Sequence, residues 1–188
     1  MRVLAIPGSL RNDSYNAKLL YNSVELFPED VALDLWGGLK DVPPYDEDDD
    51  GVDPPTAVAK LREAIAGADA VLIATPEYNS SIPGQLKNAF DWVSRPIATN
   101  PMRNKPVAVI GASTGAFGGV WAQAELRKVL AALGARVLEV ELAVPHADVQ
   151  FDQFGRLTDQ NLTEQLVAVT DAIVLAAAER AARIQVTA

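Results

Sequence analysis

The first of three polar segments that could hold a small molecule is GSLRNDSYN, at 8–16. It supplies Ser9, Arg11, Ser14 and Asn16 between a short apolar run and a helical pattern. Backbone N–H groups at a helix N-terminus attract anions, and a guanidinium forms forked hydrogen bonds with phosphate oxygens. We therefore expect a phosphate pocket here. An ordinary capped turn is the alternative, because Ser and Asn are also common N-cap residues.

Two familiar phosphate-binding motifs are absent from the sequence. It contains neither GxxxxGK[ST], the P-loop of ATPases, nor GxGxxG, the dinucleotide fingerprint. A loop with separate hydroxyl and amide side chains and one arginine suits a single phosphate better than a pyrophosphate or triphosphate. The ligand expected at 8–16 therefore carries one phosphate group.

The second and third polar segments also follow apolar runs. TPEYNSSIPGQLKNAFDW, at 75–92, places prolines on both sides of Asn79, Ser80 and Ser81, which predicts a stiff loop with exposed polar groups. Such a loop suits a flat ring with polar edges. GASTGAFGG, at 111–119, is rich in small residues that let the backbone approach a ligand closely. A tight turn whose glycines serve only packing is the alternative for this third segment.

Composition and charge exclude several classes of function. The chain has 188 residues, 49% of them hydrophobic, and a formal net charge of −9, which argues against binding nucleic acid through the whole surface. Without cysteine, a disulfide, a thiolate nucleophile or a Cys-bound iron–sulfur cluster is excluded. A His-based metal cluster needs several histidines and the chain has only His146, so no metal is expected. The acidic run at 46–50 is interpreted as a solvated surface.

No targeting or membrane segment is expected. The N-terminus begins with a strand-like run rather than a signal peptide, and no apolar stretch is interpreted as long enough to span a bilayer. We therefore predict a cytoplasmic protein with no membrane partner.

Apolar runs and helical spacing alternate along the chain. Strands are predicted at 3–6, 31–35, 70–74, 107–110 and 136–142, and helices at 16–27, 55–65, 83–94, 120–133 and 162–184, with an irregular polar loop at 36–55. This alternation predicts one α/β domain over 1–188, with a five-stranded parallel sheet and helices on both faces. Ligands of such sheets bind beyond the carboxyl ends of the strands, where the three polar segments lie.

The three segments together are recognisable. GSLRNDSYN, PEYNSSIPGQLKNAFDW and STGAFGG resemble, in the same order, the NADPH-dependent FMN reductase family. This family has a flavodoxin-like three-layer fold with strand order 2-1-3-4-5 and includes quinone, azo-compound and chromate reductases. The resemblance covers nearly the whole chain, and the second motif is its most specific part.

The resemblance implies a set of cofactor-binding residues in each loop. The first loop would surround the FMN phosphate with Ser9, Arg11, Ser14, Tyr15 and Asn16. The second would lie along the isoalloxazine ring with Pro76, Glu77, Tyr78, Asn79 and Ser81. The third would approach the flavin from the far side of the pocket with Ser113, Thr114 and Gly115. Glu77 is expected to act through its backbone, because a buried negative charge beside reduced flavin would be unfavourable.

The resemblance also implies a function. NAD(P)H would transfer a hydride to FMN, and the reduced flavin would then reduce a small-molecule acceptor such as a quinone, a flavin, an azo compound or a metal oxyanion. No residue decides between NADPH and NADH. A flavodoxin-like electron carrier and a regulatory protein that has lost its flavin are the competing interpretations.

A homodimer or homotetramer is also expected. The helix at 83–95 carries Leu86, Ala89, Phe90 and Trp92, which is more apolar surface than a solvent-facing helix needs. The family supports a subunit interface at this helix, next to the flavin. Burial of the same side chains in the core of one chain is the alternative.

Overall fold

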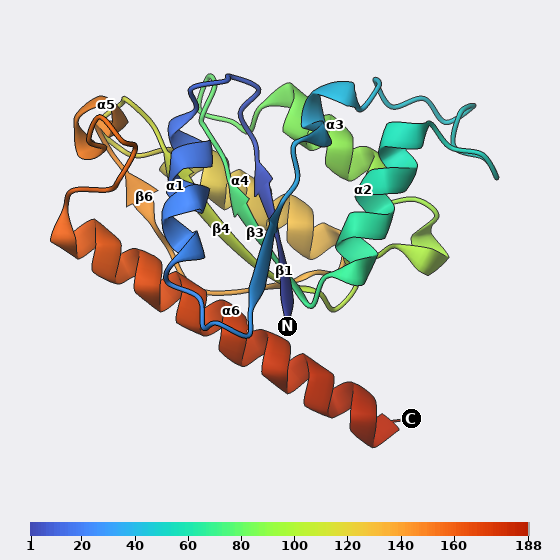
Figure 1. Ribbon diagram of the computed structural model, residues 1–188. Helices are drawn as coiled ribbons and strands as arrows, with labels where there is room; N and C mark the ends of the chain where they lie inside the picture. The colour runs from blue at the N-terminus through green and yellow to red at the C-terminus, as the bar shows by residue number, and fades with distance from the viewer. Residues whose placement is uncertain (188) are drawn as a thin grey trace.

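A parallel sheet forms the centre of the computed structural model, which describes residues 1–187 (Figure 1). Its strands are β1 (Arg2–Pro7), β2 (Ala32–Leu35), β3 (Ala70–Ala74), β4 (Pro106–Ala112), β5 (Arg136–Val137) and β6 (Ala143–Val144). The order is β2-β1-β3-β4-β5, and β6 pairs with β4. The predicted flavodoxin-like order is therefore confirmed, with a sixth strand added.

Alternating side chains of the central strands build a core on each face of the sheet. In β1, Leu4 and Ile6 pack into one apolar cluster, while Val3 and Ala5 pack into the other. This follows from the two-residue period of a strand. Every residue of β3 and β4 is buried, as expected for central parallel strands covered on both sides.

Helices cover both faces of the sheet. The α-helices are α1 (Tyr15–Val24), α2 (Thr56–Gly67), α3 (Gly84–Val93), α4 (Val120–Ala132), α5 (Ala147–Gln150) and α6 (Gln160–Thr187), and the 3₁₀ turns are η1 (Gly38–Asp41) and η2 (Ile97–Thr99). Apolar side chains of α2, α3 and α4 join the cluster on one face. Those of α1 and α6 join the cluster on the other. The short helix α5 falls in a stretch for which no element was predicted.

The closing helix α6 meets the length and composition expected of a membrane span over Gln160–Gln185, so the prediction that no stretch is long enough was too strong. One face of the helix has a partner in the fold, however. Leu166, Val169 and Ile173 are buried against the sheet. Core helices of soluble proteins share this composition, and the C-terminal part of α6 projects beyond the sheet (Figure 1).

The predicted strand at 136–142 is interrupted. β5 pairs with the start of β4 and β6 with its end, so the chain between them leaves the ladder. The guanidinium of Arg127 enters this gap from α4, and its Nη2 donates to the carbonyl oxygens of Val109 and Val140, both at 2.9 Å. The side chain thus supplies the bridge that a continuous strand would have made through its backbone.

The apolar surface of α3 belongs to the core of the same chain. Leu86, Phe90, Trp92 and Val93 are at most 1% exposed. The indole N–H of Trp92 donates to the carbonyl of Pro43 at 2.9 Å, which fixes the polar loop over this helix. The alternative of an intramolecular core is the observed one, and these side chains do not provide a subunit interface.

Candidate functional site

The three polar loops meet at the carboxyl edge of the sheet. In the parallel ladder Pro7 is level with Ala74, and Ala74 with Ile110, so the loops after β1, β3 and β4 begin side by side. Together they enclose a cavity of about 140 Å³. Its lining residues are Ser9, Arg11, Ser14, Tyr15, Asn16, Pro76, Glu77, Tyr78, Ala112, Ser113 and Thr114.

Most of the residues predicted for the site are therefore brought together. Asn79, Ser81 and Gly115 do not line the cavity, although they lie in the loops that form it. Ala112, the last residue of β4, lines it without having been predicted. An alanine has no side-chain chemistry, so only its position at a strand end could have indicated it.

The first loop begins with a close backbone approach and ends in a helix cap. Gly8 donates to the carbonyl of Ala74 at 2.8 Å, and a Cβ at Gly8 would lie 2.9 Å from Leu86 Cδ2. At the other end, Ser14 is the N-cap of α1, where its Oγ accepts from the backbone N–H of Ala17 at 3.3 Å. Because Ser14, Tyr15 and Asn16 line the cavity, the N-terminus of α1 lies at its edge.

Arg11 is the charged side chain of the first loop that lines the cavity. Arg11 donates through Nη2 to the backbone carbonyl of Asp13 at 3.1 Å, and its guanidinium lies 5.9 Å from the centre of the Tyr15 ring. The nearby carboxylate of Asp13 is paired with Lys18 at 2.5 Å. This hydrogen bond and charge hold the pKa of Asp13 below its ordinary value. Lys18 thus offsets the one carboxylate in the loop, which favours an anion beside Arg11.

The side chain of Asn16 joins the first loop to the third. Asn16 is 3% exposed, and its amide donates to the carbonyl of Ala112 and accepts from the N–H of Ala112, both at 2.9 Å. The amide is therefore used within the protein. These two bonds give Asn16 a positioning role, and its expected contact with the phosphate stays a prediction.

The second loop contains a tight hairpin turn. Tyr78 and Ser81 exchange two backbone hydrogen bonds of 3.0 and 3.1 Å, while Asn79 and Ser80 have φ angles of 52° and 60°. Two successive residues with positive φ are the signature of a type I′ turn, in which asparagine is favoured. The turn accounts for Asn79 as a backbone-shaping residue, and it leaves the Tyr78 side chain 49% exposed at the cavity.

Two carboxylates tie the second loop to helix α4. Oε2 of Glu77 accepts from the backbone N–H groups of Trp121 and Ala122, both at 3.0 Å, in the first turn of α4. One turn later, Oε2 of Glu125 accepts from the hydroxyl of Ser81 at 2.5 Å. The carboxylate is thus engaged with α4, and the expectation that Glu77 contacts the flavin through its backbone stays a prediction. Its charge lies at the positive end of the helix dipole, which stabilises both partners.

The third loop is held from below by the chain around β6. Ser113 donates its backbone N–H to Val144 and accepts from Ala147, both at 3.0 Å, and His146 donates its backbone N–H to Gly115 at 3.1 Å. Gly118 has a φ of 61°, and a Cβ there would lie 2.7 Å from the backbone of Ala143 and Val144. At Gly118, a side chain would thus be excluded both by conformation and by space.

The arrangement can bind and orient, but it offers no acid/base pair. The Glu77 carboxylate is held by the N-terminus of α4, so it does not pair with Tyr78 in proton transfer. Over residues 1–187, no three His, Cys, Asp or Glu side chains are placed to hold a metal ion. Hydroxyls, a guanidinium and a helix N-terminus at one end, with backbone and an aromatic ring at the other, fit an organic cofactor carrying one phosphate.

Known proteins resemble the chain over almost its full length. The family described as NADPH-dependent FMN reductase matches residues 1–149. An NAD(P)H-dependent FMN reductase of Pseudomonas aeruginosa is 42% identical over 176 residues, which are 93% of this chain and 94% of that protein. A 2-hydroxy-1,4-benzoquinone reductase of a Burkholderia species is 38% identical over 174 residues, or 91% of this chain and 93% of that protein.

Solved structures of flavin-dependent oxidoreductases also resemble this chain. FerB, a flavoenzyme NAD(P)H:(acceptor) oxidoreductase from Paracoccus denitrificans, matches with a TM-score of 0.82 at 35% identity, covering 95% of this chain and 97% of its own. An FMN-dependent NADH-azoreductase from Bacillus anthracis, in complex with FMN, matches with a TM-score of 0.61 at 16% identity, covering 91% and 98%. At that identity the second likeness shows the fold alone.

Proposed function

Because the chain belongs to the NADPH-dependent FMN reductase family, we propose that its three loops at the carboxyl edge of the sheet form the FMN site of a quinone-reducing enzyme. The chain is an FMN-dependent NAD(P)H oxidoreductase. The observation that supports this location is the single cavity shared by Ser9, Arg11 and Ser14 of the first loop with residues of the other two.

Each end of the cavity has a role in this proposal. The hydroxyls of Ser9 and Ser14, the guanidinium of Arg11 and the first N–H groups of α1 would hold the phosphate. Asn16 would keep the first loop against the end of β4 through its two hydrogen bonds with Ala112. In this proposal Ser9, Arg11 and Ser14 bind the phosphate, and Asn16 positions the loop that carries them.

At the other end, Pro76, Glu77 and Tyr78 would lie along the ring system. FMN held there would supply the redox chemistry, which is two-electron transfer from NAD(P)H to the acceptor. The protein orients the ring through the rigid turn after Tyr78, and loop backbone N–H groups can stabilise negative charge on it. In the overall reaction NAD(P)H, a proton and a quinone give NAD(P)⁺ and a hydroquinone.

A planar acceptor fits the surroundings of the site. Two aromatic side chains near the loops, Phe117 and Trp121, are 61% and 48% exposed and contact each other edge to face at 5.0 Å. Together with Tyr78 they offer flat apolar surface beside the cavity. The Burkholderia relative and two Pseudomonas putida relatives are named quinone reductases, which favours the quinone class.

We extend the proposal to assembly and location. Since α3 is buried within the chain, a homodimer or homotetramer would use other apolar surface, and Phe117, Val120 and Trp121 provide it next to the site. Sedimentation of a monomer-sized species at micromolar protein would contradict this. We propose a single domain over 1–188 that works in the cytoplasm, where NAD(P)H is supplied, with no nucleic-acid or membrane partner.

The deciding experiment combines an absorbance spectrum with steady-state kinetics. The purified protein should show a flavin spectrum, or acquire one on addition of FMN. It should then oxidise NADPH or NADH continuously with benzoquinone, in a ping-pong pattern. Flavin binding without turnover would favour an electron carrier, and a protein that takes up no FMN would overturn the proposed site.

A further inference from the structure

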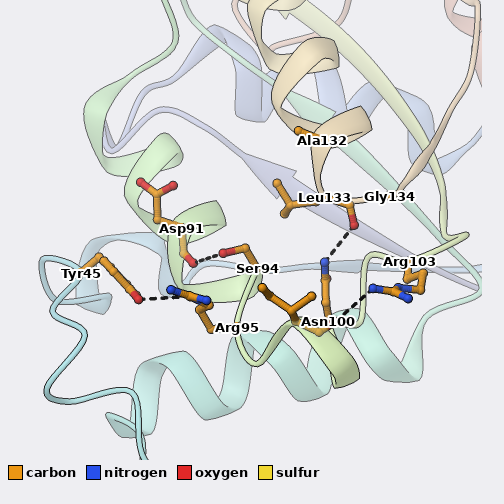
Figure 2. Close-up of a pocket in the computed structure, with 10 residues that line it drawn as sticks. Tyr45, Asp91, Ser94, Arg95, Asn100, Arg103, Ala132, Leu133 and Gly134 are labelled. Carbon is orange, nitrogen blue, oxygen red and sulfur yellow. Dashed lines mark hydrogen bonds between the residues drawn. The ribbon is translucent and has the colours of Figure 1, made fainter.

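A second cavity, of about 550 Å³, lies at the opposite edge of the sheet from the three loops. It is formed by the end of α3, the connection 94–105 and the end of α4 (Figure 2). Both helices start at the loop edge and run back along the sheet, so their last turns lie at its other edge. The seven residues of β4 separate the two cavities, which corresponds to roughly 20 Å.

Two arginines face this second cavity, one at each end of the connection that forms its floor. Figure 2 shows Arg95 and Arg103 on opposite sides of Asn100. The placement is unusual for a chain whose formal net charge is −9. Guanidinium groups bind carboxylate and phosphate oxygens through paired N–H donors, so the two arginines indicate an oxyanion.

Arg95 makes two long polar contacts, and Arg103 makes one hydrogen bond. Arg95 lies 3.4 Å from the Tyr45 hydroxyl and 3.5 Å from a carboxylate oxygen of Glu47, whose side chain is 80% exposed. Arg103 donates through Nη2 to the carbonyl of Ile97 at 3.2 Å. A guanidinium has five N–H donors, so these contacts leave donors of both arginines available to a ligand.

The carboxylate in the lining does not neutralise this charge. Asp91 lies on the wall formed by α3, where its Oδ1 is 2.6 Å from the ammonium of Lys87 on the same helix. From the polar loop, Glu47 and Asp50 both act on Arg95, but the Glu47 side chain is 80% exposed and Asp50 is paired with Arg62 at 2.8 Å. The second cavity therefore keeps a positive character, which favours an anion with one acidic group.

The frame between the arginines is fixed by backbone contacts. The amide of Asn100 donates to the carbonyl of Leu133 at 2.8 Å, and its Oδ1 accepts from Met102 at 2.9 Å. Asn104 donates to the carbonyl of Gly134 at 2.8 Å. These bonds join the connection to the end of α4, so the positions of the arginine backbones are set before any ligand arrives.

The second cavity also has apolar surface beside its two arginines. Ile97 is 62% exposed, and the side chains of Leu133 and Tyr45 form other parts of the wall. A bare inorganic anion would leave this surface in water, whereas a ligand with a planar apolar body would cover it. The volume of about 550 Å³ also falls within the usual range of small-molecule sites.

We propose that this second cavity binds a small aromatic oxyanion, that is, a planar ring system carrying one carboxylate or phosphate group. Arg95 and Arg103 would contact the anionic group, and Ile97, Leu133 and Tyr45 would pack against the ring. The site is separate from the FMN loops and does not rest on the function proposed for them.

Isothermal titration of the FMN-loaded, full-length protein at low salt tests the proposal. AMP and benzoate are the probes, and adenosine is the neutral control. We expect at least one oxyanion to bind with a Kd below about 1 mM, and adenosine to bind at least tenfold more weakly. Binding of AMP alone would assign a phosphate ligand, and binding of benzoate alone a carboxylate. Binding of neither probe would overturn the proposal.

Variants locate the bound probe. Arg103→Ala should weaken binding about tenfold or more, because a charged hydrogen bond is lost, while its FMN content and NADPH oxidation stay unchanged. Arg156→Ala, which removes an equally charged and exposed side chain elsewhere, should leave binding within about twofold. A probe that NADPH displaces and that Arg103→Ala does not affect would lie at the FMN loops and contradict the proposal. Arg11→Ala should retain probe binding, so the two sites can fail independently.

Discussion

The side-chain amide of Asn16 and the backbone of Ala112 form two reciprocal hydrogen bonds, each 2.9 Å long, between the start of α1 and the end of β4. Both partners are at most 3% exposed. Because Asn16 is the last residue of the first polar segment and Ala112 lies at the start of the third, this pair fixes how far apart the two loops stand. The separation of the loops is thus set by a side chain that uses its carbonyl oxygen and one amide N–H within the protein.

Replacing Asn16 should therefore affect both stability and FMN binding. Asn16→Ala leaves the buried N–H and C=O of Ala112 without partners, which should lower the free energy of unfolding by about 2–4 kcal/mol. We expect the Kd for FMN to rise about tenfold, because the loops lose their spacing. Urea unfolding and fluorescence titration with FMN measure the two effects.

Asn22 provides a matched control on the same helix. Its amide donates to the carbonyl groups of Lys18 and Gly155 and accepts from the N–H of Leu157, and none of these residues lines the cavity. Asn22→Ala should lower stability by a similar amount and leave FMN affinity unchanged. Equal loss of FMN affinity in both variants would show that Asn16 acts through general stability alone.

A second prediction concerns the carboxylate that caps α4. Glu77→Ala removes the acceptor for Trp121 and Ala122, which should lower the free energy of unfolding by about 1–2 kcal/mol and weaken FMN binding. Glu77→Gln keeps an acceptor oxygen and should recover most of the binding. Glu63→Ala, at an exposed position on α2, is the control. If Glu77→Ala binds FMN as tightly as the parent protein, the cap on α4 has no part in flavin binding.

The sequence predicted the central strands and the polar loops because both depend on local patterns. Val71, Leu72 and Ile73 belong to a short apolar run that is typical of a strand covered on both faces, and β3 begins and ends where predicted. The polar segments follow such runs directly, so their meeting at one edge follows from parallel strands. Local patterns therefore predicted the sheet and the edge at which the three polar loops meet.

The remaining features depend on contacts between distant residues. The gap between β5 and β6 is filled by Arg127, an α4 residue that resembles any surface arginine in the sequence. The roles of Asn16 and Glu77 likewise depend on partners 96 and 45 positions away. The same amide or carboxylate would suit a ligand contact equally well, so composition alone could not separate binding from positioning.

Arg11 is the side chain on which phosphate binding should depend most. Arg11→Ala should raise the Kd for FMN by roughly tenfold to a hundredfold, since a charged hydrogen bond is worth about 1.5–3 kcal/mol. Arg11→Lys keeps the charge without the planar fork, so its Kd for FMN should lie between those of the parent protein and Arg11→Ala. Fluorescence titration at two salt concentrations measures both, and the parent protein should show the steeper salt dependence. Unchanged affinity in Arg11→Ala would remove Arg11 from the site.

The last prediction concerns the buried ammonium of Lys105, which contributes to stability in a pH-dependent way. Lys105 is 1% exposed at the start of β4, and its Nζ donates to the carbonyl groups of Ala66 and Ala68 at the end of α2. Burial lowers the pKa of Lys105 from 10.5 to about 8, and the nearby charge of Arg180 acts in the same direction. Between these two pH values the unfolded chain holds a proton on Lys105 that the folded protein has largely lost.

Stability should therefore rise with pH across this window, because the unfolded state binds more protons than the folded state. The difference in unfolding free energy between the parent protein and Lys105→Met isolates this effect, since other titrating groups are common to both. We expect that difference to shift in favour of the parent protein by on the order of 1–2 kcal/mol from pH 7.5 to pH 10. Urea unfolding at several pH values provides the measurement. A difference that stays constant or falls over the same range would show that the Lys105 ammonium keeps its proton in the folded protein.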